Sequence, residues 1–206
     1  MGRNFQKKKR NDVRRHRKPV MIITAEGKNE TEKLYFQSFQ EQYGKYNIRF
    51  VKTGMDTDPE GMLKSMNTYW KNQDLSEANG DKAYIVLDMD CDPKRISMVH
   101  RLQKTSKHVE FIASNPCIEF WFILHYKYTT HQFLDSKGAK RELARYISGY
   151  QESMDIAETI RPKLQEARKH IKQLKKHYES VGVTWGQVDC NPMTDVPVVL
   201  EELDIC

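Results

Sequence analysis

Four short runs rich in apolar residues are spaced along the first two thirds of the chain. Val20–Ala25 and Ala83–Leu87 are continuous, His108–Ala113 is mostly apolar, and Ile48–Lys52 alternates. Continuous apolar runs of this length are typical of strands that are buried on both faces of a parallel sheet. The pattern therefore predicts four strands.

Segments with helical spacing of apolar residues follow each run. One ends near Tyr43, before Gly44. The others cover Pro59–Trp70, Pro93–Ser106 and Cys117–Tyr128. Two of these begin with a proline, which is well suited to the first turn of a helix. Strand and helix alternate four times, which predicts an α/β fold with a roughly four-stranded parallel sheet and right-handed crossovers.

The remaining third of the chain reads as helical. We expect helices over Ser136–Tyr150 and 153–179, and a short last helix over Val196–Leu203. The long helix carries one apolar seam and one cationic face, typical of a helix packed on a core. We therefore divide the chain into a basic tail (1–18), an α/β core (19–130) and a helical C-terminal extension packed on that core (131–206).

Charge is distributed unevenly. Residues 1–18 contain nine Lys/Arg and one acid, whereas the whole chain contains 34 basic and 28 acidic residues, with a net charge of +6. The body is thus slightly acidic and the tail strongly basic. Such a tail is expected to be disordered by itself and able to contact several phosphates of a nucleic acid, although a merely solubilising role is the alternative.

The apolar segments are too short for a membrane span, and no secretory signal is evident, so a cytoplasmic protein is expected. The four cysteines have spacings that match no zinc or disulfide pattern. They are read as free thiols in a reducing compartment.

Acidic residues follow the ends of the predicted strands. Glu26 comes after the first, Asp88 and Asp90 after the third, and Glu119 lies in the first turn after the fourth. Equivalent ends of parallel strands meet at one sheet edge, where α/β proteins bind ligands. Crowded carboxylates repel one another unless a cation intervenes, and Mg²⁺ prefers oxygen ligands. A metal site is therefore predicted. Asp92 is a further candidate ligand, with a helix N-cap as the alternative.

The same residues carry a resemblance. A glutamate after the first strand and an Asp-x-Asp after a later one resemble the Toprim domain of topoisomerases, primases and OLD-family nucleases. Within that group the chain resembles the RloB family. The residues that carry this second likeness are the Lys/Arg-rich start, Glu26-Gly27, Thr31-Glu32, Leu34-Tyr35-Phe36, Val86–Asp90, Ser114-Asn115-Pro116-Cys117-Ile118-Glu119-Phe120-Trp121 and Asn191-Pro192.

The resemblance implies a Toprim-like fold, dependence on Mg²⁺ or Mn²⁺, and nuclease activity on RNA (tRNA-like) or DNA. It also implies a role as the effector of an anti-phage defence system with an ATPase partner. Glu26, Asp88, Asp90 and Glu119 would be catalytic, and Glu26, Asp88, Asp90, Asp92, Glu30 and Glu32 would hold metal. Glu30 and Glu32 have first-turn helix acids as their alternative role.

Substrate contacts are expected from loop and tail residues. Ser114 and Asn115 would bind phosphate or cap a helix, and Lys28 would neutralise a phosphate or be merely solvated. The remaining candidates are the tail cations Lys7, Lys8, Lys9, Arg10, Arg14 and Arg15. The competing function is a non-catalytic subunit that binds nucleic acid or a partner. No phosphate-binding glycine loop is present, so ATP hydrolysis would come from another chain. Homo-oligomerisation is left open.

Overall fold

The computed structural model describes residues 17–26, 30–40, 44–52 and 58–204. Its centre is a five-stranded sheet in the order β2-β1-β3-β4-β5. The strands are β1 (Val20–Ala25), β2 (Asn47–Phe50), β3 (Lys82–Asp88), β4 (Val109–Asn115) and β5 (Met193–Thr194). The first four are parallel to one another, and β5 pairs with β4 in the antiparallel direction. The predicted α/β class is confirmed, and the sheet is consistent with a Toprim-like fold.

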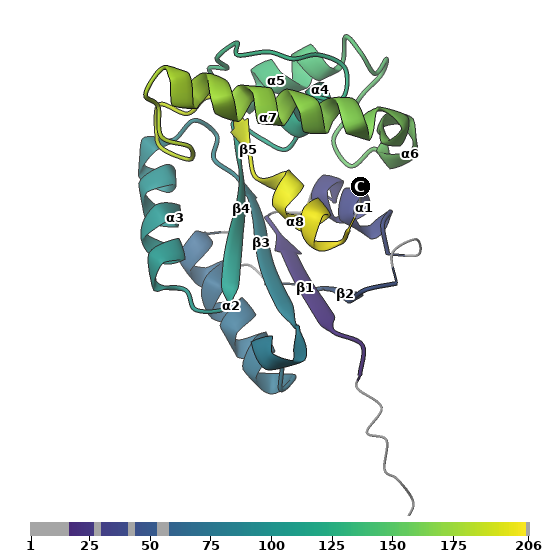
Figure 1. The fold of residues 1–206 in the computed structure, drawn as a ribbon, viewed down its shortest axis with the longest axis vertical. Coiled ribbons are helices and arrows are strands. Elements are labelled where there is room, and N and C mark those ends of the chain that lie inside the picture. The colour runs from purple at the N-terminus through teal and green to yellow at the C-terminus, as the bar shows by residue number, and fades with distance from the viewer. Residues whose placement is uncertain (1–16, 27–29, 41–43, 53–57, 205–206) are drawn as a thin grey trace, which may run out of the picture.

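Helices cover both faces of the sheet and one of its ends (Figure 1). They are α1 (Thr31–Gln37), α2 (Pro59–Asn72), α3 (Pro93–Thr105), α4 (Glu119–Ile123), α5 (Ser136–Leu143), α6 (Ala157–Ile160), α7 (Leu164–Ser180) and α8 (Val196–Glu202), with 3₁₀ turns η1 (Glu77–Asn79) and η2 (Arg161–Lys163). The helices α2 and α3 lie against one face, and α1 and α8 lie against the other. In Figure 1, α4, α5 and α7 gather at the end of the molecule toward which the parallel strands run.

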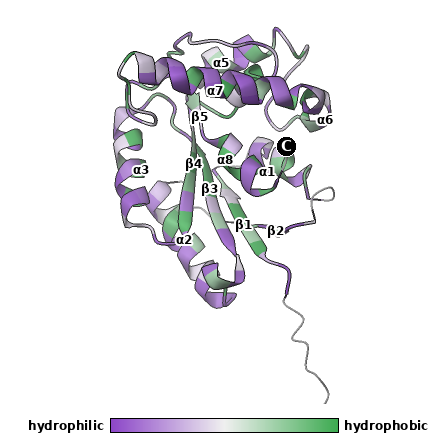
Figure 2. Cartoon of the chain, viewed as in Figure 1, coloured by the Kyte–Doolittle hydropathy of each residue, from purple (hydrophilic) through white to green (hydrophobic). Residues whose placement is uncertain are grey.

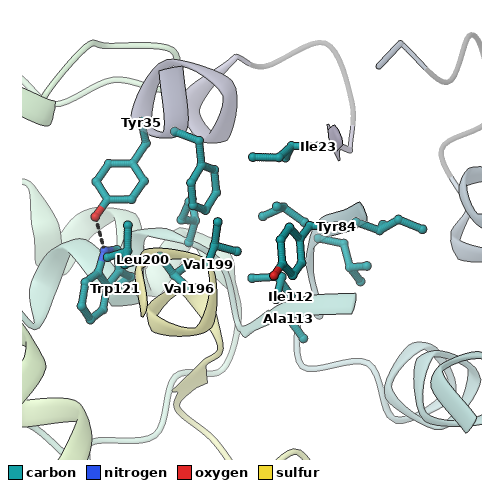
Figure 3. Packing of buried hydrophobic residues seen from close by; sticks show 14 of the residues in the cluster. Ile23, Tyr35, Tyr84, Ile112, Ala113, Trp121, Val196, Val199 and Leu200 are labelled. Atoms are coloured by element: carbon teal, nitrogen blue, oxygen red, sulfur yellow. Dashed lines mark hydrogen bonds between the residues drawn. The ribbon is translucent and has the colours of Figure 1, made fainter. Parts of the chain in front are cut away.

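The central strands are apolar throughout because helices bury both of their faces. All but the last residue of β1, and all but the two end residues of β3, are buried. These strands are largely green in Figure 2, whereas the outer surface of α7 is mostly purple. On the α1 and α8 face, Val199 lies toward Ile23 and Ile112, and Leu200 lies beside Trp121 (Figure 3). The burial of these side chains supplies the main driving force for holding α8 on the sheet.

A buried hydrogen bond joins α4 to α1. The indole Nε1 of Trp121 in α4 donates to the hydroxyl of Tyr35 in α1 at 2.7 Å (Figure 3). Both side chains are almost fully buried. A buried polar group without a partner is costly, so this bond fixes how α4 sits beside α1. The elements that follow β1 and β4 are thereby held together.

Two expectations about the C-terminal third are wrong. The sheet has a fifth strand, β5, within a segment for which the sequence pattern predicts only helices. The helix expected over 153–179 is broken into α6, η2 and α7. Pro162 lies at the break, and a proline inside a helix lacks the N–H group and clashes with the preceding turn. The C-terminal third therefore adds a strand to the sheet as well as helices around it.

The basic tail lies outside the described residues apart from Arg17 and Lys18. Arg17 donates to the buried carboxylate of Asp81, which also accepts from the backbone N–H groups of Val20 and Ser76, both at 2.8 Å. The Asp81 carboxylate thus secures the start of β1. Among the described residues, no helix is both long enough and apolar enough to cross a bilayer.

Candidate metal centre

A cavity of about 210 Å³ lies where the parallel strands end. It is lined by Glu26, Thr31, Glu32, Asp88, Asp90, Glu119, Lys140 and Glu152. Six of these eight residues are acidic and one is basic, so the cavity has a strong excess of negative charge. Carboxylates gathered in this way need a cation or bound protons to offset their repulsion.

The topology of the sheet explains why these acids meet. The strand order reverses beside β1, because β2 lies on one side of it and β3 on the other. Such a reversal leaves a crevice at the carboxyl ends of the two central strands. Glu26 directly follows β1 and Asp88 ends β3, so both side chains lie at this crevice. Glu119 begins α4 beyond β4, and Glu32 is the second residue of α1.

The turn after β3 holds Asp90 in place through its backbone. Asp90 and Cys91 have positive φ angles of 51° and 58°, in the left-handed region. Two consecutive residues other than glycine in this region are uncommon, and such conformations cluster at functional sites. The Asp90 N–H donates to the carbonyl of Pro116 at 2.9 Å, and the Cys91 N–H to Oδ1 of Asn115 at 3.0 Å. The turn after β4 therefore braces the turn after β3.

Neighbouring groups orient several of the carboxylates. Oδ1 of Asp88 accepts from the N–H of Ile118 at 2.9 Å, and Oε1 of Glu119 accepts from the Tyr150 hydroxyl at 2.9 Å. The hydroxyl of Ser136 donates to Asp90. Within the described part of the chain, Oε2 of Glu32 and Oε2 of Glu119 are buried and have no hydrogen-bond partner. Two buried oxygens without a partner that belong to residues lining one cavity are suited to bind a cation.

Arg95 brings a positive charge to the outer side of the site. Its guanidinium pairs with the carboxylate of Glu26, and its Nε donates to the carbonyl of Asp88 at 2.6 Å. Burial raises the pKa of Glu26, the charge of Arg95 opposes this shift, and the nearby Asp90 carboxylate adds to it. Because the net shift is upward, Glu26 is a better proton carrier near neutral pH than an ordinary surface glutamate.

The deeper carboxylates are still more perturbed. Burial raises the pKa of Glu32 to about 7, and the charges of Glu119 and Glu26 act in the same direction. Burial also raises the pKa of Asp88 well above its usual range, and the charges of Glu32, Glu119 and Asp90 add to the effect. In the metal-free protein these groups therefore hold protons that a divalent cation would displace.

Residues from the C-terminal third, which the sequence pattern does not single out, complete the cavity. Lys140 of α5 lines it and pairs with Glu152. Burial alone would lower the pKa of Lys140, but the hydrogen bond to Glu152 and the charge of Glu119 raise it, so the amine stays positive. Residues 150–153 contact two sides of the site. The Tyr150 hydroxyl donates to Glu119, and the Ser153 N–H donates to Oγ1 of Thr31 at 2.9 Å.

The other predicted residues lie elsewhere. Asp92 is exposed and caps α3, since its carboxylate accepts from the Lys94 N–H at 2.8 Å. Glu30 is exposed and pairs with Lys33. Neither acid is among the residues that line the cavity. Lys28 and the tail cations Lys7, Lys8, Lys9, Arg10, Arg14 and Arg15 lie outside the described residues.

Ser114 and Asn115 are buried in the frame of the site rather than exposed to a ligand. The hydroxyls of Ser114 and Thr194 share a hydrogen bond of 2.8 Å, and Nδ2 of Asn115 donates to the carbonyl of Cys190 at 3.1 Å. Both side chains are at most 2% exposed. They connect the turn after β4 to β5 and to the segment before it.

The donor atoms fit a divalent cation. One oxygen each of Asp88 and Glu119 and the sulfur of Cys117 lie within 4.8 Å of one another. Together with the orphaned oxygens of Glu32 and Glu119, this group could bind a metal ion. Sequence order alone does not single out this sulfur, because Cys117 is an isolated cysteine in the turn after β4.

The fold and the site define a class: an α/β protein with a Toprim-like sheet and a carboxylate-lined cavity at the point where the strand order reverses. The chain belongs to the family of RloB-like proteins, because the sequence model of that family matches residues 21–203. The matched region includes every residue that lines the cavity. No curated protein and no solved structure matches the chain.

Proposed function

We propose that this RloB-like protein is a phosphodiesterase that cleaves RNA or DNA and depends on Mg²⁺ or Mn²⁺. The observation that supports the proposal is the gathering of Glu26, Glu32, Asp88, Asp90 and Glu119 in one cavity at the ends of parallel strands. A protein that only bound nucleic acid would have no use for carboxylates near phosphates, which they repel.

The chemistry divides between the metal and the chain. A divalent cation at such a site polarises a phosphodiester and makes a bound water more acidic. Asp88 and Glu119 are the residues best placed to hold it, because their oxygens lie within 4.8 Å of each other. Glu26, with its raised pKa, is suited to carry a proton to or from the reacting oxygens.

The two positive side chains of the site have complementary roles in this proposal. Lys140 is held inside the cavity by Glu152, and Arg95 is held at its edge by Glu26. A positive charge that faces the phosphate stabilises the charge that develops during cleavage. The basic tail would add contacts to phosphates without sequence preference.

The test is cleavage by the purified protein of tRNA, single-stranded RNA and plasmid DNA, with Mg²⁺, with Mn²⁺ and with a chelator. We expect metal-dependent cleavage of at least one substrate, and its loss in Asp88→Asn and Glu119→Gln. Asp74→Asn is the matched control, because Asp74 is exposed and its φ of 48° suits asparagine. Cleavage that survives both site substitutions would refute the proposal. Metal-independent binding without cleavage would favour the non-catalytic subunit.

We also propose that the nuclease is the effector of an ATPase-partnered anti-phage system. The support is the RloB-like family membership together with a chain whose sequence contains no glycine-rich ATP-binding loop. The test is co-purification with any ATPase encoded by a neighbouring gene, followed by nuclease assays of the complex with and without ATP. Failure to co-purify, or a cleavage rate indifferent to the ATPase, would reject the partnership and leave the metal centre unaffected.

A further inference from the structure

Cys117 lies beneath the floor of the acidic cavity. It follows Pro116 in the turn after β4, and its side chain is fully buried. It does not line the cavity, but its sulfur lies within 4.8 Å of oxygens of Asp88 and Glu119. The next residue, Ile118, donates its N–H to Asp88 at 2.9 Å, which fixes the thiol relative to that carboxylate.

Beside this thiol, the carboxylate of Glu119 has one oxygen without a hydrogen-bond partner in the described part of the chain. Glu119 is 2% exposed, and its Oε2 has no hydrogen-bond partner among the described residues, although Tyr150 satisfies Oε1. The Cys117 sulfur has a long contact of 3.8 Å to the carbonyl of Ser136. A buried carboxylate oxygen and a buried thiol that lie side by side form a donor pair that one metal ion could bind.

We propose that Cys117 is a metal ligand, and that Asp88, Cys117 and Glu119 bind a divalent ion that readily accepts a sulfur ligand, such as Co²⁺ or Zn²⁺, in preference to Mg²⁺. The inference rests on the proposed metal centre and is independent of the nuclease activity. Oxygen ligands alone suit Mg²⁺, whereas a thiolate shifts the preference toward transition metals. Binding replaces the S–H bond with a metal–sulfur bond, and the proton passes to solvent.

The mixed donor set has a consequence for metal choice. Affinity for divalent ions at one N/O/S site rises along the series from Mn²⁺ to Cu²⁺, and Zn²⁺ also binds strongly. A site with one sulfur and two carboxylates would therefore retain Zn²⁺ against a large excess of Mg²⁺. Zinc is then expected to compete with magnesium for Asp88 and Glu119, so that zinc occupancy becomes a control on the site.

The first test uses Co²⁺ as a spectroscopic probe of the full-length protein. A cobalt–thiolate bond gives a charge-transfer absorption band in the near ultraviolet. We expect this band in the wild-type protein, its loss in Cys117→Ser, and its retention in a variant with Cys91, Cys190 and Cys206 all replaced by serine. Cd²⁺ affinity should fall by about 10- to 100-fold in Cys117→Ser while Mg²⁺ affinity is unchanged. Bound cobalt without the band would overturn the proposal.

The second test needs no variant. X-ray absorption at the zinc edge of the zinc-loaded wild-type protein should show a sulfur neighbour at about 2.3 Å, and a shell of oxygen and nitrogen alone would refute the thiolate ligand. These measurements separate the two ideas. A sulfur neighbour in a protein that cleaves no nucleic acid keeps the inference and rejects the proposed function. Cleavage without a sulfur neighbour does the reverse.

Discussion

Glu32 is the site residue whose proton has the clearest effect on stability. Its carboxyl is buried, and burial raises its pKa from 4.5 to about 7. A carboxyl with a raised pKa in the folded state stabilises the fold below its unfolded pKa, and that contribution is lost as the pH rises through the folded pKa. The raised pKa of Asp88 has the same sign. The metal-free protein should therefore lose stability from pH 5 to pH 8.

Comparison with Glu32→Gln isolates this effect. We expect the free energy of unfolding of the wild type, relative to the variant, to fall by up to about 3 kcal/mol over that interval. The measurement is urea unfolding of both proteins in a chelator at matched pH values. Groups far from Glu32 titrate alike in both proteins, so the difference reports Glu32 together with the carboxylates whose charges act on it or feel it, above all Asp88 and Glu119. A difference that stays constant with pH would show that Glu32 is ionised throughout.

Tyr150 has a more local role, which is to hold Glu119. Burial and the nearby Glu119 carboxylate raise the pKa of Tyr150 far above its usual range, so the hydroxyl remains a donor. Tyr150→Phe would leave Oε1 of Glu119 without this bond and should cost about 1–3 kcal/mol. The matched control is Tyr146→Phe, which removes a longer bond of 3.3 Å to Glu142 and should cost less. Equal losses in urea unfolding would contradict a special role for Tyr150.

The carboxylates of the site were predictable from the sequence because each follows the end of a strand. Glu26, Asp88 and Glu119 needed only the assumption of a parallel sheet to be placed together. Lys140 and Cys117 could not be found in this way. Lys140 reaches the cavity from the short helix α5, and Cys117 comes near Asp88 through the turn between β4 and α4. Neither position leaves a periodic signal in the sequence.

Among the elements, the short strand β5 is expected to contribute to the stability of the fold. It contributes two residues, and Thr194 shares a buried hydrogen bond with Ser114 of β4. Thr194→Val would leave the Ser114 hydroxyl and the Val196 N–H without this partner, and Ser114→Ala would leave the Thr194 hydroxyl with only the Val196 N–H at 3.3 Å. Each should cost about 1–3 kcal/mol, whereas the double variant should cost less than the sum. Urea unfolding of the four proteins measures this coupling.

Cleavage assays of the same four proteins test the expectation that Ser114 binds phosphate. If Ser114 is structural, the double variant should cleave substrate at nearly the wild-type rate under conditions in which it is folded. A rise in KM that appears in Ser114→Ala and persists in the double variant would instead place the hydroxyl against the substrate. The 1% exposure of Ser114 favours the first outcome.

The wrong predictions of secondary structure concern elements that depend on contacts between distant segments. A strand as short as β5 exists only because β4 offers it an edge, and two residues cannot show an alternating pattern. The continuous apolar seam over 153–179 concealed the break at Pro162, although proline itself gave a local warning. The long strands and the helices α2 and α3 were predicted well because their signals are local and periodic.

At the scale of the whole protein, the proposed function requires an acidic cavity to attract a polyanion. The acidic and basic residues are separated along the chain. The acids line one cavity, whereas nine basic residues lie within positions 1–18. We expect the tail to supply most of the salt-dependent affinity for nucleic acid. Each lost phosphate contact reduces the slope of log affinity against log salt by about 0.9 for duplex DNA and about 0.7 for single strands.

The structure indicates where the tail can be removed without disturbing the fold. Arg17 pairs with the buried Asp81, so the deletion should end at residue 16 and keep that ion pair. Binding is measured in an Asp88→Asn background, which prevents cleavage. The deletion should flatten the salt dependence by several contacts, whereas Lys172→Gln/Lys176→Gln, which removes two exposed cations from α7, should change it little. An unchanged slope after the deletion, with a flatter one in the α7 variant, would move the phosphate-binding surface from the tail to α7.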